Sequence, residues 1–257
     1  VPANGFVFMD SEQLFLTGSG VYAVTTENVS GEKYTQNRSF YINKVFCEEE
    51  LLKAFCAKWK QFYVIAVGGK LYLLDSSQKS YQRGEPLSSF QYECYLWTGI
   101  DARILWEEDG ELFFGDNEGN ICKFTEGRYS DNGKAINAYW TVPDFSGGSF
   151  WKNKTVRMVA IEAAAFPQNE IRLESTKNGF WEVLREWKGK ISFFSWESIN
   201  WENFTWSTNS RPRTLTLKTK IKKFDKTSFR IVCDKENMAF GLYGFALEYT
   251  ENGRYKK

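Results

Sequence analysis

Short apolar runs separated by glycine turns fill the first half of the chain. Three segments share one design, an apolar run, a glycine-containing turn and a second apolar run: LFLTGSGVYAV (14–24), FYVIAVGGKLYLLD (62–75) and ELFFGDNEGNICKF (111–124). Apolar runs bounded by turn residues predict β-strands. The second runs begin at Val21, Leu71 and Ile121, so the spacing is 71 − 21 = 50 and 121 − 71 = 50 residues. A fixed period of this length predicts a repeated β-unit.

Further strand-like runs surround each hairpin. An aromatic run follows each of the three: SFYINKVF (39–46), FQYECYLW (90–97) and AINAYWTV (135–142). Two repeats also have a run in front of the hairpin, FVFM (6–9) and RILW (103–106). A four-stranded meander that recurs at this period is typical of a β-propeller blade. The alternative is a stack of unrelated hairpins in a sandwich, and the regular spacing favours the propeller.

The first domain is therefore expected to cover residues 1–142 as three blades. We expect the hairpin tips near Gly18–Gly20, Gly68–Gly69 and Asp116–Gly119. A closed propeller has at least about four blades, so three blades leave apolar faces open. Either further blades lie upstream of Val1, or a partner covers these faces.

The glycine-bracketed run GDNEGN (115–120) has three interpretations: a calcium loop, a phosphate-binding loop or a turn. Its polar side chains do not keep the ligand spacing of a calcium loop. No Lys-Ser/Thr pair follows the glycines, which a nucleotide-binding loop requires. Asp, Asn and Gly all favour tight turns. We interpret the run as the turn of a hairpin.

One helix is predicted within the repeats, in EEELLKAFCAKWKQF (48–62). Its apolar residues Leu52, Phe55, Cys56 and Trp59 follow the spacing of one helix face. Glutamates at its start and lysines near its end suit the helix dipole. We expect a short helical insertion that packs on the edge of a blade.

The fifty-residue pattern ends near Pro143, where the glycines of DFSGGS mark a domain boundary. Longer runs follow, separated by turn signals: KTVRMVAIEAAAF (154–166), EIRLEST (170–176), FWEVLREW (180–187), RTLTLKTKIKKF (213–224), SFRIVCD (228–234) and MAFGLYGFALEYT (238–250). They predict an antiparallel β-sandwich for residues 143–257. The predicted fold class is all-β: a partial β-propeller of four-stranded meander blades, one short helical insertion, and an antiparallel β-sandwich.

The densest aromatic stretch is SWESINWENFTWS (195–207), in which Trp196, Trp201 and Trp206 are five residues apart. A period of five fits neither a strand face nor a helix face. One interpretation is that the indoles pack within the domain or contact a neighbouring subunit. The other is that they stack on sugar rings. These three tryptophans are the candidate binding residues.

Three lysines alternate along one predicted strand, Lys218, Lys220 and Lys222. They form either a solvated sheet face that discourages edge pairing or the lining of an electropositive groove. Lysine plus arginine exceeds aspartate plus glutamate by only one charge (33 − 32 = +1). Nucleic-acid binding is therefore not favoured. No apolar run is long enough to span a bilayer, so no membrane partner is expected.

The chain has no histidine, which removes Ser-His-Asp and Cys-His catalysis. Its five cysteines are scattered, with no CxxC pair, which suits a reducing compartment and predicts neither a zinc site nor a disulfide framework. Paired carboxylates are the remaining catalytic option. The acidic run WEEDGE (106–111) surrounds a predicted turn and needs no catalytic explanation. We expect no enzyme activity, no cofactor and no metal.

The runs YVIAVGGKLYLLD (63–75) and LFFGDNEGNICKF (112–124) resemble the blades of propeller-bearing structural proteins from tailed phages and prophages. The closing stretch, residues 218–257, is similar to the β-rich C-terminal domains that follow such propellers. This resemblance implies a virion protein at the head–tail junction or tail, assembled in the bacterial host cytoplasm. Its partners would be other virion proteins, in a homo-oligomeric ring, and no catalytic residues are implied. The alternative is a carbohydrate-binding module or receptor-binding adhesin that binds a glycan through its tryptophans.

Overall fold

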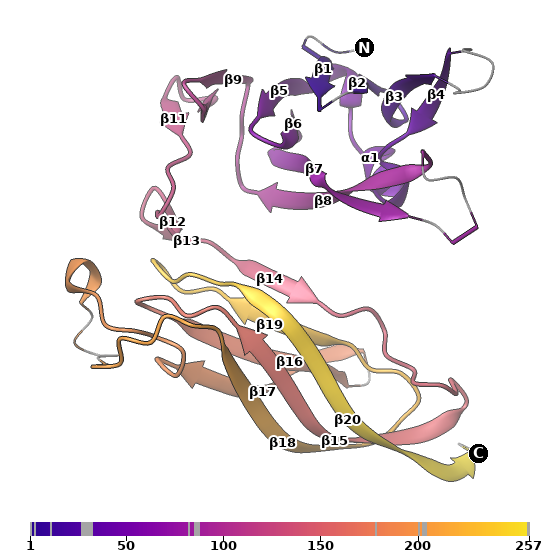
Figure 1. The fold of residues 1–257 in the computed structure, drawn as a ribbon, viewed down its shortest axis with the longest axis vertical. Helices are drawn as coiled ribbons and strands as arrows, with labels where there is room; N and C mark the ends of the chain where they lie inside the picture. The colour runs from indigo at the N-terminus through magenta and orange to yellow at the C-terminus, as the bar shows by residue number, and fades with distance from the viewer. Residues whose placement is uncertain are drawn as a thin grey trace. The chain divides into compact units, whose positions relative to one another are not determined.

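The computed structural model describes residues 2, 4–10, 12–26, 33–81, 83–84, 88–177, 179–199, 201 and 205–255. The predicted all-β class is confirmed, since antiparallel sheets dominate and the α-helix found is short (Figure 1). The chain divides into two compact units, Val1–Glu126 and Gly127–Lys257. The division lies earlier in the chain than the expected 142. No helix in the described ranges is both long and apolar enough to cross a membrane.

The first unit contains three antiparallel sheets, each made of strands that follow one another in the chain (Figure 1). The first sheet consists of β1 (Phe6–Met9), β2 (Glu12–Thr17), β3 (Gly20–Thr26) and β4 (Lys33–Asn37). The second sheet consists of β5 (Phe55–Trp59), β6 (Phe62–Val67), β7 (Lys70–Tyr81) and β8 (Phe90–Thr98). The third sheet consists of β9 (Ile104–Glu108), β10 (Glu111–Gly115) and β11 (Ile121–Lys123). Pairing between consecutive strands is what short glycine turns favour.

The three predicted hairpins are confirmed. β2 pairs with β3, β6 with β7, and β10 with β11, each in a different sheet. Gly68 and Gly69 have positive φ angles of 59° and 74°, which a turn of this kind requires. In the run GDNEGN, the Asp116 carboxylate accepts hydrogen bonds from the backbone N–H groups of Glu118 and Asn120 at 2.9 and 2.8 Å. The run is therefore a turn braced by its own aspartate.

The predicted helix over 48–62 is wrong. Within 48–62 the only helical part described is a single 3-10 turn, η2 (Leu51–Lys53). The α-helix α1 (Asn43–Phe46) lies before this range, in the run SFYINKVF that was predicted as a strand, so that strand is wrong too. Residues 55–59 form β5, which pairs with β6. Cys56 and Ala57 point to opposite faces of the second sheet, into two different cores, which a strand allows and one helix face does not. Pairing within the sheet overrides the local helical pattern.

The second sheet lies between the other two and is apolar on both faces. One face joins the first sheet in a core that includes Leu14, Leu16, Val21, Tyr63, Ile65 and Tyr72. The other face joins the third sheet in a core that includes Val64, Ala66, Leu71, Leu73, Leu105 and Leu112. Burial of both faces explains why FYVIAV is a continuous apolar run instead of an alternating one.

A buried arginine ties the first sheet to the second. Arg38 is fully buried, and its guanidinium donates to Glu12 through Nε at 2.9 Å and Nη2 at 2.5 Å. Its Nη1 donates to the carbonyl oxygens of Ser88 and Phe90, and its Cζ lies 3.7 Å from the centre of the Phe90 ring. The Tyr92 hydroxyl also donates to Glu12 at 3.1 Å. Because every group of this buried pair has partners, its desolvation is offset.

The second unit contains two larger sheets and a small hairpin (Figure 1). The four-stranded sheet has the order β14 (Ala138–Thr141), β19 (Phe229–Cys233), β16 (Glu170–Lys177) and β17 (Phe180–Lys188). The three-stranded sheet has the order β18 (Arg213–Phe224), β15 (Lys152–Ala163) and β20 (Leu242–Tyr255). The hairpin pairs β12 (Ser130–Asp131) with β13 (Lys134–Ala135). Both larger sheets contribute to one apolar core.

The strand expected to close the third repeat belongs instead to the second unit. β14, within the run AINAYWTV, pairs with β19, not with the third sheet. Its Tyr139 and Trp140 lie opposite Val232 and Ile231. The prediction placed this strand from its distance along the chain, and distance carries no information about a partner that lies far away in the sequence.

An ionic cluster lies on the four-stranded sheet of the second unit. Glu174, which is buried, accepts hydrogen bonds from Arg172 Nε at 2.7 Å and from Arg230 Nη2 at 2.5 Å. Arg172 also pairs with Asp234 at 2.8 Å. Burial by itself raises the pKa of Glu174, but the hydrogen bonds from Arg172 and Arg230 outweigh it, so the pKa is lowered. The hydrogen bond from Arg172 lowers the pKa of Asp234.

Candidate functional site

The three candidate tryptophans lie in the segment that joins β17 to β18. Trp196 begins a single 3-10 turn, η3 (Trp196–Ser198). The side chains of Trp196, Trp201 and Trp206 are 77 %, 80 % and 74 % exposed. Packing of these indoles into the core of the unit is therefore ruled out. Contact of these indoles with a neighbouring subunit or with a sugar stays a prediction.

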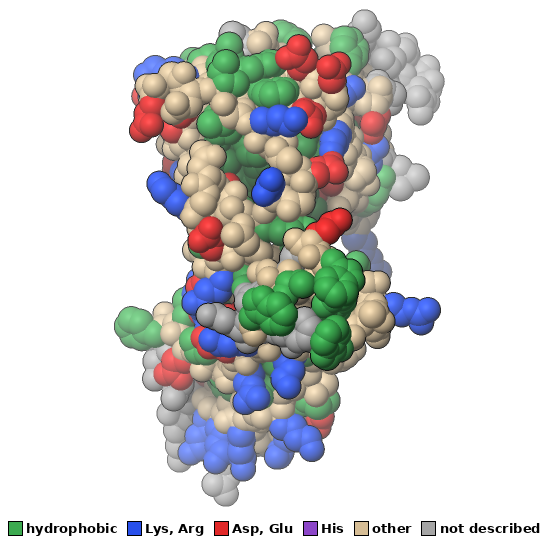
Figure 2. All heavy atoms as spheres, turned by 90° about the vertical axis from the view of Figure 1, so that its left-hand side faces the viewer, with side chains coloured by type: hydrophobic (Ala, Val, Ile, Leu, Met, Phe, Trp, Pro, Cys, Tyr) green, Lys and Arg blue, Asp and Glu red, His purple; other side chains and the backbone are tan. Residues whose placement is uncertain are grey.

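Phe194 holds two of the indoles in place. Its ring centre lies 4.8 Å from that of Trp196 and 5.3 Å from that of Trp206. The Phe194 N–H donates to the carbonyl oxygen of Ser207 at 2.7 Å, which joins the two sides of the segment. We call Phe194, Trp196, Trp201 and Trp206 the tryptophan loop. Figure 2 shows large hydrophobic side chains gathered on this side of the molecule, with Lys and Arg side chains beside them.

Arg213, at the start of β18, fixes the base of the tryptophan loop. Its Nη2 donates to Ser207 Oγ at 2.6 Å and to the carbonyl oxygen of Asn209 at 3.0 Å. Its Nη1 donates to the carbonyl oxygen of Lys190 at 3.2 Å, on the other side of the loop. The Phe193 N–H donates to the carbonyl oxygen of Phe166 at 3.2 Å. These bonds tie the two ends of the segment to each other and to the rest of the unit.

The indoles of Trp196 and Trp206 do not form a flat platform. The plane of Trp196 makes an angle of 81° with the Phe194 ring, and the plane of Trp206 makes an angle of 31° with it. The two indole planes therefore differ by at least 81 − 31 = 50°. A sugar ring that stacks on one indole cannot lie flat on the other. Two crossed aromatic planes form a knob, which suits insertion into a protein surface.

Lys218, Lys220 and Lys222 lie exposed along β18, as the alternating pattern predicts. On the opposite face of the strand, Leu217 and Ile221 pack against the core of the second unit. The strand thus has one apolar face and one basic face. These lysines are a solvated sheet face, and the hollow described next does not involve them.

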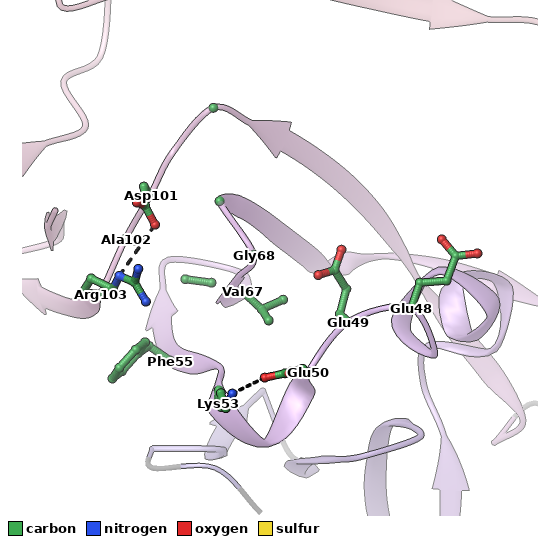
Figure 3. Close-up of a pocket in the computed structure, with 13 residues that line it drawn as sticks. Glu48, Glu49, Glu50, Lys53, Phe55, Val67, Gly68, Asp101, Ala102 and Arg103 are labelled. Atoms are coloured by element: carbon green, nitrogen blue, oxygen red, sulfur yellow. Dashed lines mark ion pairs between the residues drawn. The ribbon is translucent and has the colours of Figure 1, made fainter. Parts of the chain in front are cut away.

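The first unit contains an open hollow of about 720 Å³ (Figure 3). It is lined by residues of the 48–53 segment, the β6–β7 turn and the start of the third repeat: Glu48, Glu49, Glu50, Lys53, Phe55, Ala66, Val67, Gly68, Gly69, Gly99, Asp101, Ala102 and Arg103. The sequence pattern does not reveal this hollow, because residues 48–62 fit one helix face. No sequence signal places 48–53 beside 99–103, since only the stacking of two sheets brings them together.

Most charged groups of the hollow are paired with one another. Glu50 forms an ion pair with Lys53, and Arg103 lies 3.8 Å from Asp101 (Figure 3). Glu49 pairs with Lys70 at 2.5 Å and accepts a hydrogen bond from the Tyr72 hydroxyl at 3.1 Å. Within the described ranges, no group of His, Cys, Asp or Glu side chains has the arrangement of a metal site. The hollow is thus a salt-bridged surface depression.

Neither the acidic run WEEDGE nor the cysteines form a reactive group: the acidic side chains make local contacts, and the thiols are unpaired. Glu107 accepts a hydrogen bond from the Gly110 N–H at 2.6 Å, and Glu111 pairs with Lys123. The cysteines are all free thiols. Burial raises the pKa of Cys56 and of Cys94 to about 12 each, which keeps both thiols protonated and poorly nucleophilic.

Comparisons with known proteins do not assign the chain to a family. No family model and no curated protein matches it. Among solved structures, an exo-β-1,3-galactanase from Phanerochaete chrysosporium in complex with β-1,3-galactotriose aligns with 94 % of this chain and 67 % of its own, at 7 % identity and a TM-score of 0.21. The same enzyme with galactose aligns at 8 % identity, 94 % and 66 % coverage and a TM-score of 0.19. Scores this low support no argument about fold or activity.

Proposed function

We propose that this chain is a non-catalytic structural protein that acts through protein–protein contacts made by its tryptophan loop. The observation that carries the proposal is the exposed and non-coplanar pair Trp196 and Trp206 on Phe194. Tryptophan is enriched among the residues that dominate binding energy at protein interfaces. Exposed aromatic clusters on a soluble surface mark such interfaces.

We further propose that the protein is a component of a phage or prophage virion, located at the head–tail junction or in the tail. The support is the resemblance of its repeats to the blades of such proteins, together with three meander sheets stacked in chain order. On this proposal the first unit is a partial β-propeller and the second an antiparallel β-sandwich. Assembly would take place in the cytoplasm of the bacterial host.

Isolation of virions from the host strain tests both statements. The strain that carries the gene is induced, particles are banded by density, and their proteins are identified by mass spectrometry. We expect the chain in the particle band. A strain whose gene carries Trp206→Ala should lose the chain from the band, while Trp151→Ala should retain it, since Trp151 is also exposed but lies outside the loop. Absence of the wild-type chain from the particles would overturn the virion assignment.

The folded state of each variant is checked by thermal melting. Because Trp206 is exposed, Trp206→Ala should change the free energy of unfolding by no more than about 0.5 kcal/mol. Loss of the chain from particles would then report a lost contact. A drop of several kcal/mol would instead show that the tryptophan is part of the core, and the interface proposal would be wrong.

A second candidate function is sugar binding, which the exposure of three tryptophans favours. The angle of at least 50° between two of them, derived above, argues against a flat sugar platform. A glycan array separates the two candidates. A glycan signal that the wild type shows, that Trp206→Ala loses and that Trp151→Ala keeps would establish the sugar-binding candidate.

A further inference from the structure

The sheets of the first unit can be aligned residue for residue through their first turns. Asp10, Lys60 and Asp109 occupy the same place in the first hairpin of each sheet, with φ angles of 52°, 52° and 53°. The offsets are 60 − 10 = 50 and 109 − 60 = 49 residues. We call the face that a sheet turns toward the next sheet along the chain its forward face, and the opposite face its rear face.

The packing of these sheets has a direction. The first sheet packs its forward face, with Leu14 and Leu16, on the rear face of the second sheet, with Tyr63 and Ile65. In the alignment, Leu14 and Leu16 correspond to Val64 and Ala66, which form the forward face of the second sheet. These two residues pack on Leu105, Leu112 and Phe114, the rear face of the third sheet. The same kind of contact, a forward face packed on a rear face, thus occurs twice in this unit.

Among the described residues of this unit, no sheet packs on the rear face of the first sheet. Phe6, Phe15 and Tyr22 stack across its strands, with ring centres 5.8 and 6.1 Å apart. Phe8, on the same face, is 67 % exposed. In the alignment Phe15 corresponds to Ile65, which is fully buried in the rear face of the second sheet.

The forward face of the third sheet likewise carries no further sheet among the residues of this unit that the structure describes. Trp106 and Phe113 stack there with ring centres 5.5 Å apart and planes 10° apart. Ile121, on the same face, is 74 % exposed. Glu111 and Lys123, which also lie on this face, form an ion pair with each other. In the alignment Phe113 corresponds to Val64, which is fully buried in the forward face of the second sheet.

We infer that these two faces are the two halves of one interface, and that a second copy of this chain joins them head to tail. The forward face of the third sheet of one copy would receive the rear face of the first sheet of the next, continuing the contact seen twice within the unit. Such a heterologous contact closes a ring when its rotation allows. The inference rests on the proposed role in assembly, but it uses a surface separate from the tryptophan loop.

Complementary variants test this inference. Phe8→Glu places a charge on the rear face and leaves the forward face intact, and Ile121→Glu does the reverse. Masses are measured by light scattering after gel filtration over a range of concentrations. We expect the wild type to self-associate and each variant alone to weaken that association roughly thirty-fold or more. An equimolar mixture of the two variants should form a dimer, because one intact face of each kind remains.

Controls make the result specific. Phe180→Glu, at an exposed phenylalanine of the second unit, should self-associate like the wild type. Trp206→Ala should also self-associate, so failure of the tryptophan-loop proposal leaves this result unchanged. Near-ultraviolet circular dichroism verifies that each variant is folded. A wild type that stays monomeric at every concentration, or a mixture that stays monomeric while the wild type associates, would overturn the inference.

Discussion

The two units of the chain bury their apolar strands in different ways. In the first unit each strand pairs with its neighbours along the chain, and three sheets enclose two separate cores. In the second unit β14 pairs with β19 and β15 with β20, strands far apart in the sequence, and two sheets enclose one core. Local pairing makes each sheet a module whose stability depends on its nearest neighbours. Because strands far apart in the sequence share one core, we expect the second unit to unfold as one cooperative structure.

The largest expected effect on stability comes from truncating a buried side chain in the single core of the second unit. Phe229 is fully buried on β19, and its ring centre lies 5.5 Å from that of Phe245 on β20. Phe229→Ala should lower the free energy of unfolding of the second unit by roughly 3–5 kcal/mol. Hydrogen exchange followed by mass spectrometry should show faster exchange in both of its sheets, because both share the core.

The matched variant in the first unit is Leu112→Ala. Leu112 is fully buried between the second and third sheets. Its loss should cost roughly 2–5 kcal/mol, with faster exchange in the third sheet and little change in the first. Equal acceleration across all three sheets would show that the first unit is as cooperative as the second, and the comparison would fail.

The next effect concerns the buried arginine that joins two modules. Arg38→Met leaves the Glu12 carboxylate without its charged partner and should cost about 3 kcal/mol. The double variant Arg38→Met, Glu12→Gln should recover part of that loss, since no buried charge remains. Urea unfolding of both variants measures the difference. A double variant less stable than the single one would contradict the role of an unpaired charge.

The smallest effect is a pH dependence in the second unit. The pKa values of Glu174 and Asp234 are lowered from ordinary values of 4.5 and 3.8. Their stabilisation is therefore complete above pH 4.5 and is lost as the pH falls through the lowered pKa values. Glu174→Gln should cost about 2 kcal/mol at pH 7 and flatten the acid side of the stability curve. If the free energy of unfolding of the variant falls with pH in parallel with that of the wild type below pH 4.5, other groups are responsible for the acid sensitivity.

Local signals predicted the all-β class and the three hairpins, because glycine turns and apolar runs act over a few residues. The strand β5 was missed, since Phe55, Cys56 and Trp59 fit a helix face as well as a strand that is buried on both sides. The partner of β14 was also missed, because it lies far away in the sequence. The tryptophan loop was found from its composition, but its contacts with Phe194 and Arg213 were not, because no periodicity encodes them.

The strand order of the second unit has a consequence during protein synthesis. Each sheet of the first unit is complete as soon as its own consecutive strands have left the ribosome. β15 is the middle strand of its sheet, but both of its partners, β18 and β20, are made after it. Both of its edges therefore stay unpaired until β18 is made, and one edge stays unpaired until β20 is made. During this time the N-terminal unit can already fold, since domains generally fold in the order of their synthesis. The time that β15 spends unpaired exposes it to chaperones and to aggregation.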